Sequence, residues 1–184
     1  MRTFATGGAR LWQLSREAKI AFSAYVAFTT LGLITAVLYS IEVAGGRGLE
    51  GVRDYYSAQP AADDPGSGPA IDLAPGDERP LVVGASYRTL LEASHFHLFT
   101  VPVLLLILSH LFILAGLGRF ATIGWLLGAW GATLVHLAAP WAIHYGSSRL
   151  APLMPITGAG MLGAIAFLCL VTTLRMWRPP AGAQ

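Results

Sequence analysis

The chain has 184 residues, of which 54% are hydrophobic and only 12% are charged, with a formal net charge of +2 at pH 7. A soluble domain carries about 25% charged residues, and from Ala93 to the C-terminus this chain has no Asp, Glu or Lys. The composition therefore excludes a soluble globular enzyme, a nucleic-acid-binding module and a disordered chain. It indicates a small multi-pass membrane protein that is in contact with the lipid bilayer.

Four segments without charged side chains are long enough to cross a bilayer: 20–41, 93–117, 121–143 and 150–174. Backbone groups in lipid must be satisfied within their own segment, so each span is predicted to be a helix. Only Gly118, Arg119 and Phe120 separate the second span from the third, and another short segment joins the third to the fourth. These connections predict an all-α, up-down four-helix transmembrane bundle, with residues 1–184 forming a single membrane domain.

Basic residues near the ends of the spans predict the orientation. One side of the bundle would hold seven of them, against Glu17 as its acid: Arg2, Arg10, Arg16, Lys19, Arg119, Arg175 and Arg178. The other side would hold five: Arg47, Arg53, Arg79, Arg88 and Arg149. Basic residues favour the cytoplasmic side. We therefore expect both termini in the cytoplasm and the loop 43–92 on the extracytoplasmic side.

The loop 43–92 contains eight acidic residues and four arginines, a net charge of about −4. Its central part, 58–76, is rich in Pro, Gly and Asp and is expected to be mobile. The spacing of apolar residues predicts a short helix over 49–56, and Tyr87–Glu92 is expected to continue into the second span. The loop is either a solvated connection or a docking surface for a basic extracytoplasmic redox protein.

Five histidines supply most of the polar chemistry of the bundle: His95, His97, His110, His136 and His144. Ionisable residues within spans are costly, so each is a functional candidate, and a neutral imidazole can bind a metal or haem iron. The topology gathers all of them except His110 at the extracytoplasmic end. The one cysteine, Cys169, lies in the fourth span, and no Cys-x-x-Cys-His motif is present, which excludes a covalent c-type haem through that motif.

Two cofactor interpretations follow. The first is one b-type haem between the second and third spans, with His97 and His136 as axial ligands about 7 Å apart in depth and His95 nearby. The second is a metal site formed by Glu92, His95 and His144, with His97 as a further ligand. On a regular helix His95 and His97 are about 200° apart and cannot both face one point. A quinone contact, or histidines that only cap helix ends and bond carbonyls, are the remaining alternatives.

Small residues line part of the fourth span, at Gly158, Gly160 and Gly163, and predict close helix packing. The tryptophans of the spans are typical of interfacial belts.

The segment Ser94-His95-Phe96-His97-Leu98-Phe99 resembles a bacterial four-span inner-membrane family with a Ser-His-x-His-Leu-Phe motif at the start of its second span. The resemblance extends to Gly48–Tyr56 and to the glycine-rich fourth span that ends at Leu174–Trp177. Longer members carry a Cys-x-x-Cys-His haem site in the loop, which this chain lacks, and the family is similar in context to respiratory electron-transfer systems. The resemblance carries over only to His95 and His97.

The sequence thus favours a small membrane subunit of an electron-transfer system that works with other membrane subunits, with His97 and His136 as its cofactor contacts. The alternative is a non-catalytic scaffold or assembly subunit. A metal-dependent enzyme is disfavoured because the only carboxylates beside the bundle are Glu42 and Glu92, at its edge.

Overall fold

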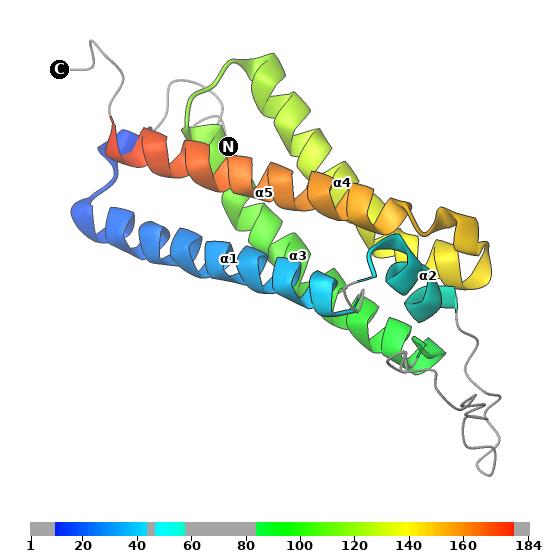
Figure 1. Ribbon diagram of the computed structural model, residues 1–184. Coiled ribbons are helices and arrows are strands. Elements are labelled where there is room, and N and C mark those ends of the chain that lie inside the picture. The colour runs from blue at the N-terminus through cyan, green and yellow to red at the C-terminus, as the bar shows by residue number, and fades with distance from the viewer. Residues whose placement is uncertain (1–9, 44–46, 58–83, 179–184) are drawn as a thin grey trace, which may run out of the picture.

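The structure is a computed structural model that describes residues 10–43, 47–57 and 84–178, and these residues form helices and turns without any strand. The helices are α1 (Arg16–Val43), α2 (Leu49–Ser57), α3 (Tyr87–Leu114), α4 (Arg119–Tyr145) and α5 (Leu153–Trp177), with short 3-10 turns η1 (Leu11–Gln13) and η2 (Ser148–Leu150). The four long helices are each long and apolar enough to cross a membrane (Figure 1). The predicted all-α four-helix membrane bundle is confirmed.

Two helix ends differ from the predicted spans because of local backbone chemistry. Helix α3 ends at Leu114, since Gly116 adopts a left-handed φ of 71°, the conformation that commonly terminates helices. The turn therefore precedes Arg119, which already begins α4, and the predicted turn over Gly118, Arg119 and Phe120 is placed too late. Similarly, α5 begins only after Pro152, which occupies its N-cap.

The predicted helix at 49–56 is confirmed as α2, and the predicted continuation of Tyr87–Glu92 into the second span is confirmed as the first turns of α3. Ser86 caps α3, because its hydroxyl accepts a hydrogen bond from the Thr89 backbone N–H at 3.1 Å. The segment 58–76, predicted to be mobile, lies outside the described residues.

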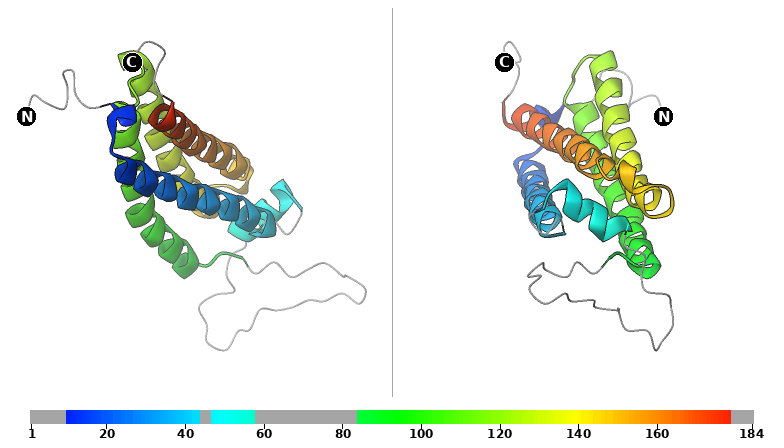
Figure 2. Two further views of the ribbon diagram at one scale, coloured as in Figure 1. Left: turned by 90° about the vertical axis from the view of Figure 1, so that its left-hand side faces the viewer. Right: turned by 45° about the vertical axis from the view of Figure 1, so that its right-hand side comes forward.

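Helix α5 is the centre of the bundle, because it contacts α1, α3 and α4 (Figure 2). Its buried side chains supply half of the main core cluster: Met161, Ala164, Ile165, Leu168 and Cys169. The small residues of α5 face α4: a Cβ built at Gly160 would lie 3.9 Å from Ala132 Cβ. Gly163, by contrast, faces open space, so the predicted close packing holds for only part of the glycine face.

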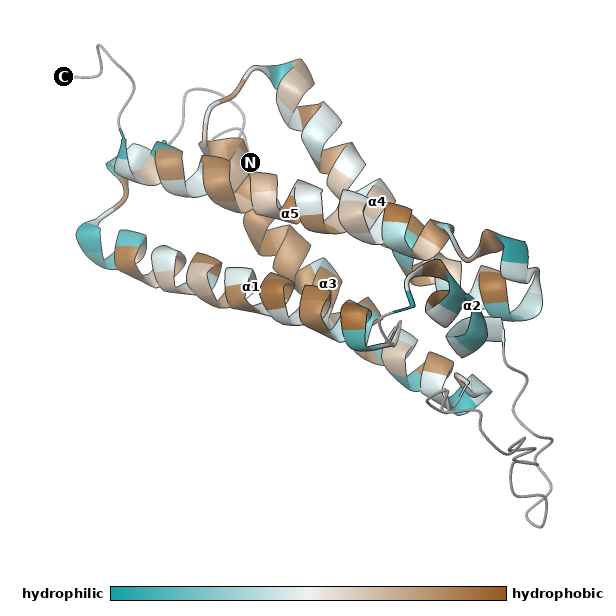
Figure 3. Cartoon of the chain, in the orientation of Figure 1, coloured by the Kyte–Doolittle hydropathy of each residue, from teal (hydrophilic) through white to brown (hydrophobic). Residues whose placement is uncertain are grey.

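Helix α1 is the least buried of the four spans. Only 6% of its most apolar stretch is buried, against 28% for α3. Many of its exposed side chains are apolar, among them Phe28, Leu31 and Leu38, and in Figure 3 the ribbon of α1 carries brown segments between paler and teal ones. An interhelical hydrogen bond links α1 to α3: the Tyr25 hydroxyl donates to the Leu104 carbonyl at 2.9 Å. Because lipid offers that hydroxyl no other partner, the bond helps to hold α1 against the bundle.

We expect Tyr25→Phe to destabilise the bundle by about 1 kcal/mol, since interhelical hydrogen bonds in membranes contribute roughly that much. The measurement is the free energy of unfolding in detergent. Thr35→Val is the matched control, because the Thr35 hydroxyl lies on the same helix and bonds only carbonyls of α1 itself. Equal stability of the two variants would contradict a tethering role for Tyr25.

Candidate functional site

Helices α3 and α4 are held in register by two tryptophan–serine hydrogen bonds. Trp141 Nε1 donates to Ser94 Oγ at 2.7 Å, and Trp130 Nε1 donates to Ser109 Oγ at 3.2 Å. These tryptophans therefore bond across the helix pair rather than only forming the interfacial belt expected from the sequence. The register places His97 level with the turn that contains Ala139, so His136 lies within about 5 Å of it in depth.

The ring of His97 has a defined tautomer. Its Nδ1 lies 2.7 Å from the carbonyl oxygen of Ala93, one turn earlier in α3. A carbonyl can only accept, so the Nδ1–H of His97 donates this bond. In the neutral ring Nε2 then carries the free lone pair, the form in which imidazole binds a metal. His110 makes the same bond to the Leu106 carbonyl, also at 2.7 Å, deeper in the span.

His136 reaches the same tautomer by a different route. Its Nδ1 lies 3.0 Å from Thr157 Oγ1 on α5, and that hydroxyl donates to the Leu153 carbonyl at 2.6 Å. Because the Thr157 proton is committed to Leu153, its oxygen accepts from the Nδ1–H of His136. The chain of two hydrogen bonds leaves Nε2 of His136 with its lone pair free.

His97 and His136 come from the adjacent helices α3 and α4 and lie at similar depths along them. His136 is half-buried, whereas His97 lies on the exposed outer half of α3. Gly158 makes room for His136, because a Cβ there would lie 3.2 Å from the His136 Cε1 atom. The two histidines that the sequence nominated as axial ligands therefore lie on adjacent helices, each with its Nδ1 hydrogen-bonded within the protein, and their role as ligands stays a prediction.

His144 binds α2 rather than the other histidines. Its Nδ1–H donates to the Tyr56 carbonyl at 2.9 Å, and the backbone N–H of Ala85 donates to the Tyr55 carbonyl at 2.7 Å. The last carbonyls of a helix have no partner within it. Both bonds satisfy such carbonyls, so they dock the C-terminal end of α2 beside the end of α4.

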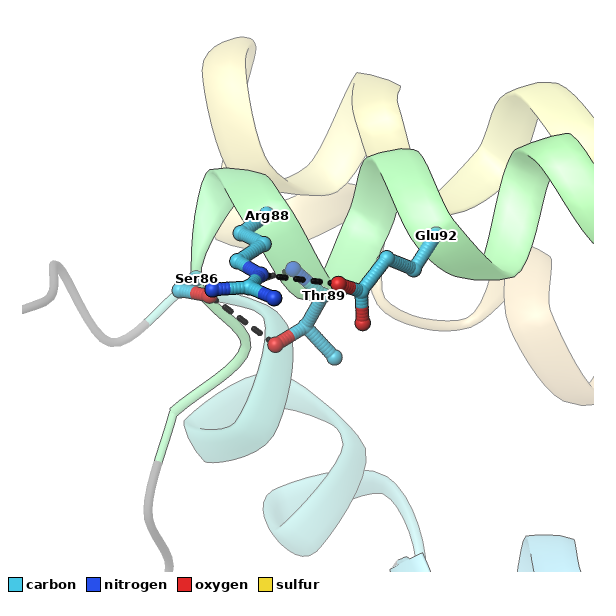
Figure 4. Close-up of polar contacts among 4 residues, drawn as sticks. All are labelled: Ser86, Arg88, Thr89 and Glu92. Carbon is cyan, nitrogen blue, oxygen red and sulfur yellow. Dashed lines mark hydrogen bonds and ion pairs between the residues drawn. The ribbon is translucent and has the colours of Figure 1, made fainter.

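The three residues of the predicted metal site, Glu92, His95 and His144, have separate partners. Glu92 pairs with Arg88 at 2.8 Å on the same face of α3 (Figure 4). The ring of His95 packs against Phe99, with 5.0 Å between the ring centroids. Across residues 10–43, 47–57 and 84–178, no group of three or more His, Cys, Asp or Glu side chains is arranged to hold a metal ion.

Sequence reasoning missed Thr157 and Tyr56. One feature of the sequence points to Thr157. The connection between α4 and α5 is short, so a hydroxyl early in α5 lies at the same depth as the outer half of α4, where His136 is. The Tyr56 contact uses a backbone carbonyl, which no side-chain pattern reveals.

A family model described as a transmembrane helical domain, Aq_1264_TM, matches residues 46–183. The chain belongs to this family. The match agrees with the coarser part of the resemblance seen at Ser94–Phe99, namely membership of a membrane family. No curated protein and no solved structure matches the chain.

Replacing Thr157 by Val should release the His136 tautomer, because valine keeps the shape but cannot accept from Nδ1–H. We expect a mixture of His136 tautomers in nitrogen NMR of the labelled imidazoles and an unchanged His97 ring. Thr173→Val is the matched control, since its hydroxyl bonds only the Cys169 carbonyl on the same helix. A His136 ring that stays protonated at Nδ1 in Thr157→Val would contradict the assigned chain of bonds.

The docking of α2 should weaken at high pH. Burial raises the pKa of the Tyr56 phenol, with smaller contributions from Tyr55 and Tyr39. The docked form thus holds its proton more tightly than the undocked form, whose pKa is about 10. Docking should be fully stable below about pH 10 and should be lost progressively above it.

The measurement is an absorbance titration of phenolate together with hydrogen exchange of α2. Tyr56→Phe should weaken this pH dependence, leaving the part that comes from Tyr55, whose pKa burial also raises. His144→Ala should undock α2 at neutral pH. An ordinary pKa for Tyr56 in the native protein would refute the buried placement.

Proposed function

We propose that the protein is a small membrane subunit of an electron-transfer system, with His97 and His136 as the contacts for one b-type haem. A single observation carries the proposal: two imidazoles from the adjacent helices α3 and α4 lie at similar depth, each with its Nδ1–H already bonded inside the protein. Nitrogen donors of this kind fit haem iron. His95, on the same turn of α3 as His97, is a neighbour of the site rather than a ligand.

The surroundings of the two rings suit a bound planar group. The Ala93 carbonyl and the Thr157 hydroxyl accept from the two Nδ1–H groups and so fix the orientation of the imidazoles. The outer half of α3 is exposed in this chain, so a flat apolar group can lie along it at the lipid boundary. When bound, haem supplies one-electron transfer. The role of the protein would be to hold and orient the haem within the membrane, where water is excluded.

Orientation and partners belong to the same proposal. We place both termini in the cytoplasm of a bacterium and the loop 43–92 on the extracytoplasmic side of the inner membrane, because basic residues gather at the end of the bundle that holds η1. The acidic excess of the loop comes from 58–83, which has five acids and one arginine. A basic extracytoplasmic redox protein is complementary to that negative charge. The hydrogen bond between His144 and Tyr56 holds α2, the helix that precedes residues 58–83, beside the end of α4.

A scaffold or assembly subunit is the second candidate. The observation that favours it is the exposed apolar face of α1, which other membrane subunits can cover. In this case the histidine bonds serve only to satisfy polar groups within lipid.

A reduced-minus-oxidised optical spectrum of the purified protein tests the proposal. We expect a b-type haem signal that is lost in His97→Ala and in His136→Ala. His110→Ala is the matched control, because His110 makes the same backbone bond deeper in α3 and should leave the signal intact. A protein without chromophore when expressed with ample haem would overturn the electron-transfer proposal and favour the scaffold.

A further inference from the structure

Charge is segregated between the two ends of the bundle. At the end that holds η1, the described residues include six bases and, as their acid, Glu17: Arg10, Arg16, Lys19, Arg119, Arg175 and Arg178. At the opposite end, the described residues balance, with four bases and four acids: Arg47, Arg53, Arg88, Arg149, Glu42, Glu50, Asp54 and Glu92. The ion pairs Arg47–Asp54 and Arg88–Glu92 both lie at that balanced end. The basic end therefore has a surplus of positive charge that the described part of the chain does not neutralise.

Arg10 and the 3-10 turn η1 pack against this basic end. Leu11 of η1 is 1% exposed and packs in a second core cluster with Leu111, Ala115 and Met176. The Arg10 guanidinium is pressed against Gly116 in the turn between α3 and α4, where a Cβ would lie 1.9 Å from its Nη1 atom. The start of α1 and the end of α5 lie side by side there (Figures 1 and 2).

Lys19 occupies the seam between α1 and α5, which we define by Trp12, Lys19, Ser23 and Trp177. Its ammonium donates to the Trp12 carbonyl at 2.9 Å and lies 5.8 Å from the centre of the Trp177 ring. Trp177 is itself fixed by donating from Nε1 to Ser23 Oγ at 3.0 Å. An ammonium has three N–H groups, so two remain for a ligand once the bond to Trp12 is made.

Exposed apolar side chains adjoin the bases at this end. Ile20 follows Lys19, Phe120 follows Arg119 and Leu174 precedes Arg175, with exposed fractions of 56%, 89% and 42%. A ligand with an anionic head and apolar tails meets both kinds of surface at once. An acidic soluble partner would leave the apolar side chains uncovered.

We propose that the Lys19 seam binds the phosphate of an anionic phospholipid, with Arg16 beside it. Arg16 precedes Lys19 by one turn on the same helix face, and Arg175 in the last turn of α5 adds positive charge to this end of the bundle. Lysine is a standard point-charge partner for phosphate, and basic pockets between membrane helices are typical lipid headgroup sites. The lipid then joins α1, the least buried span, to α5. This site is independent of the histidines.

The test compares phosphatidylglycerol with phosphatidylcholine of the same acyl chains, added to the full chain in detergent. Native mass spectrometry counts retained lipid, and thermal unfolding reports stability. We expect preferential retention of phosphatidylglycerol and a higher unfolding temperature, with retention about fivefold weaker in Lys19→Gln. Lys19→Arg should keep most of the binding. Arg149→Gln is the matched control, because it removes one charge from the opposite end and should bind like the unaltered protein.

Equal retention of the two lipids, or equal binding by Lys19→Gln, would overturn the proposal. So would stabilisation by inorganic phosphate as large as that by the lipid, or binding of an acidic peptide without lipid preference. If Lys19→Gln does not fold, the unaltered protein still decides the matter: retention of phosphatidylglycerol must fall with added salt, and salt-independent retention would refute an ionic site.

Discussion

A hydrogen-bond donor inside a bilayer has to find its acceptor within the protein, and this constraint determines the state of the histidines. Three imidazoles use a backbone carbonyl and His136 uses a threonine hydroxyl that is itself committed to a carbonyl. In each case the proton lies on Nδ1, so the lone pair lies on Nε2. The tautomer favourable for ligation therefore follows from satisfying polar groups in lipid. The same hydrogen bonds are expected whether the histidines bind a haem or only satisfy their own polar groups in lipid. The optical spectrum of the purified protein, rather than the hydrogen bonds, therefore distinguishes a redox subunit from a scaffold.

The position of these rings depends on how α5 packs. Glycine at 158 lets the His136 ring approach α5, and Thr157 beside it supplies the acceptor. Small residues thus do two things here: they shorten the distance between helices, as in other membrane bundles, and they leave a space that an imidazole fills. The serine–tryptophan bonds between α3 and α4 add the register that sets His97 near the depth of His136.

Hydropathy and length were sufficient to predict the four spans, because lipid leaves a long apolar segment no alternative to a helix. Apolar spacing likewise predicted α2. The exact ends were not predictable at the α3–α4 turn, since Gly116 and Gly118 were both available to stop α3 and only the backbone decides between them. The histidine pair was nominated from topology, but Thr157 was not, because its role depends on the rotation of α5. The contact of His144 with Tyr56 depends on where α2 docks, which the intervening sequence does not specify.

The family match begins at residue 46, after the end of α1, and the structure gives this boundary a physical meaning. Most of the buried side chains of the bundle belong to α3, α4 and α5, whereas α1 contributes Val26 and Thr29 to the interior. Substitutions along most of α1 should therefore disturb the interior of the bundle less than substitutions along α3, α4 and α5.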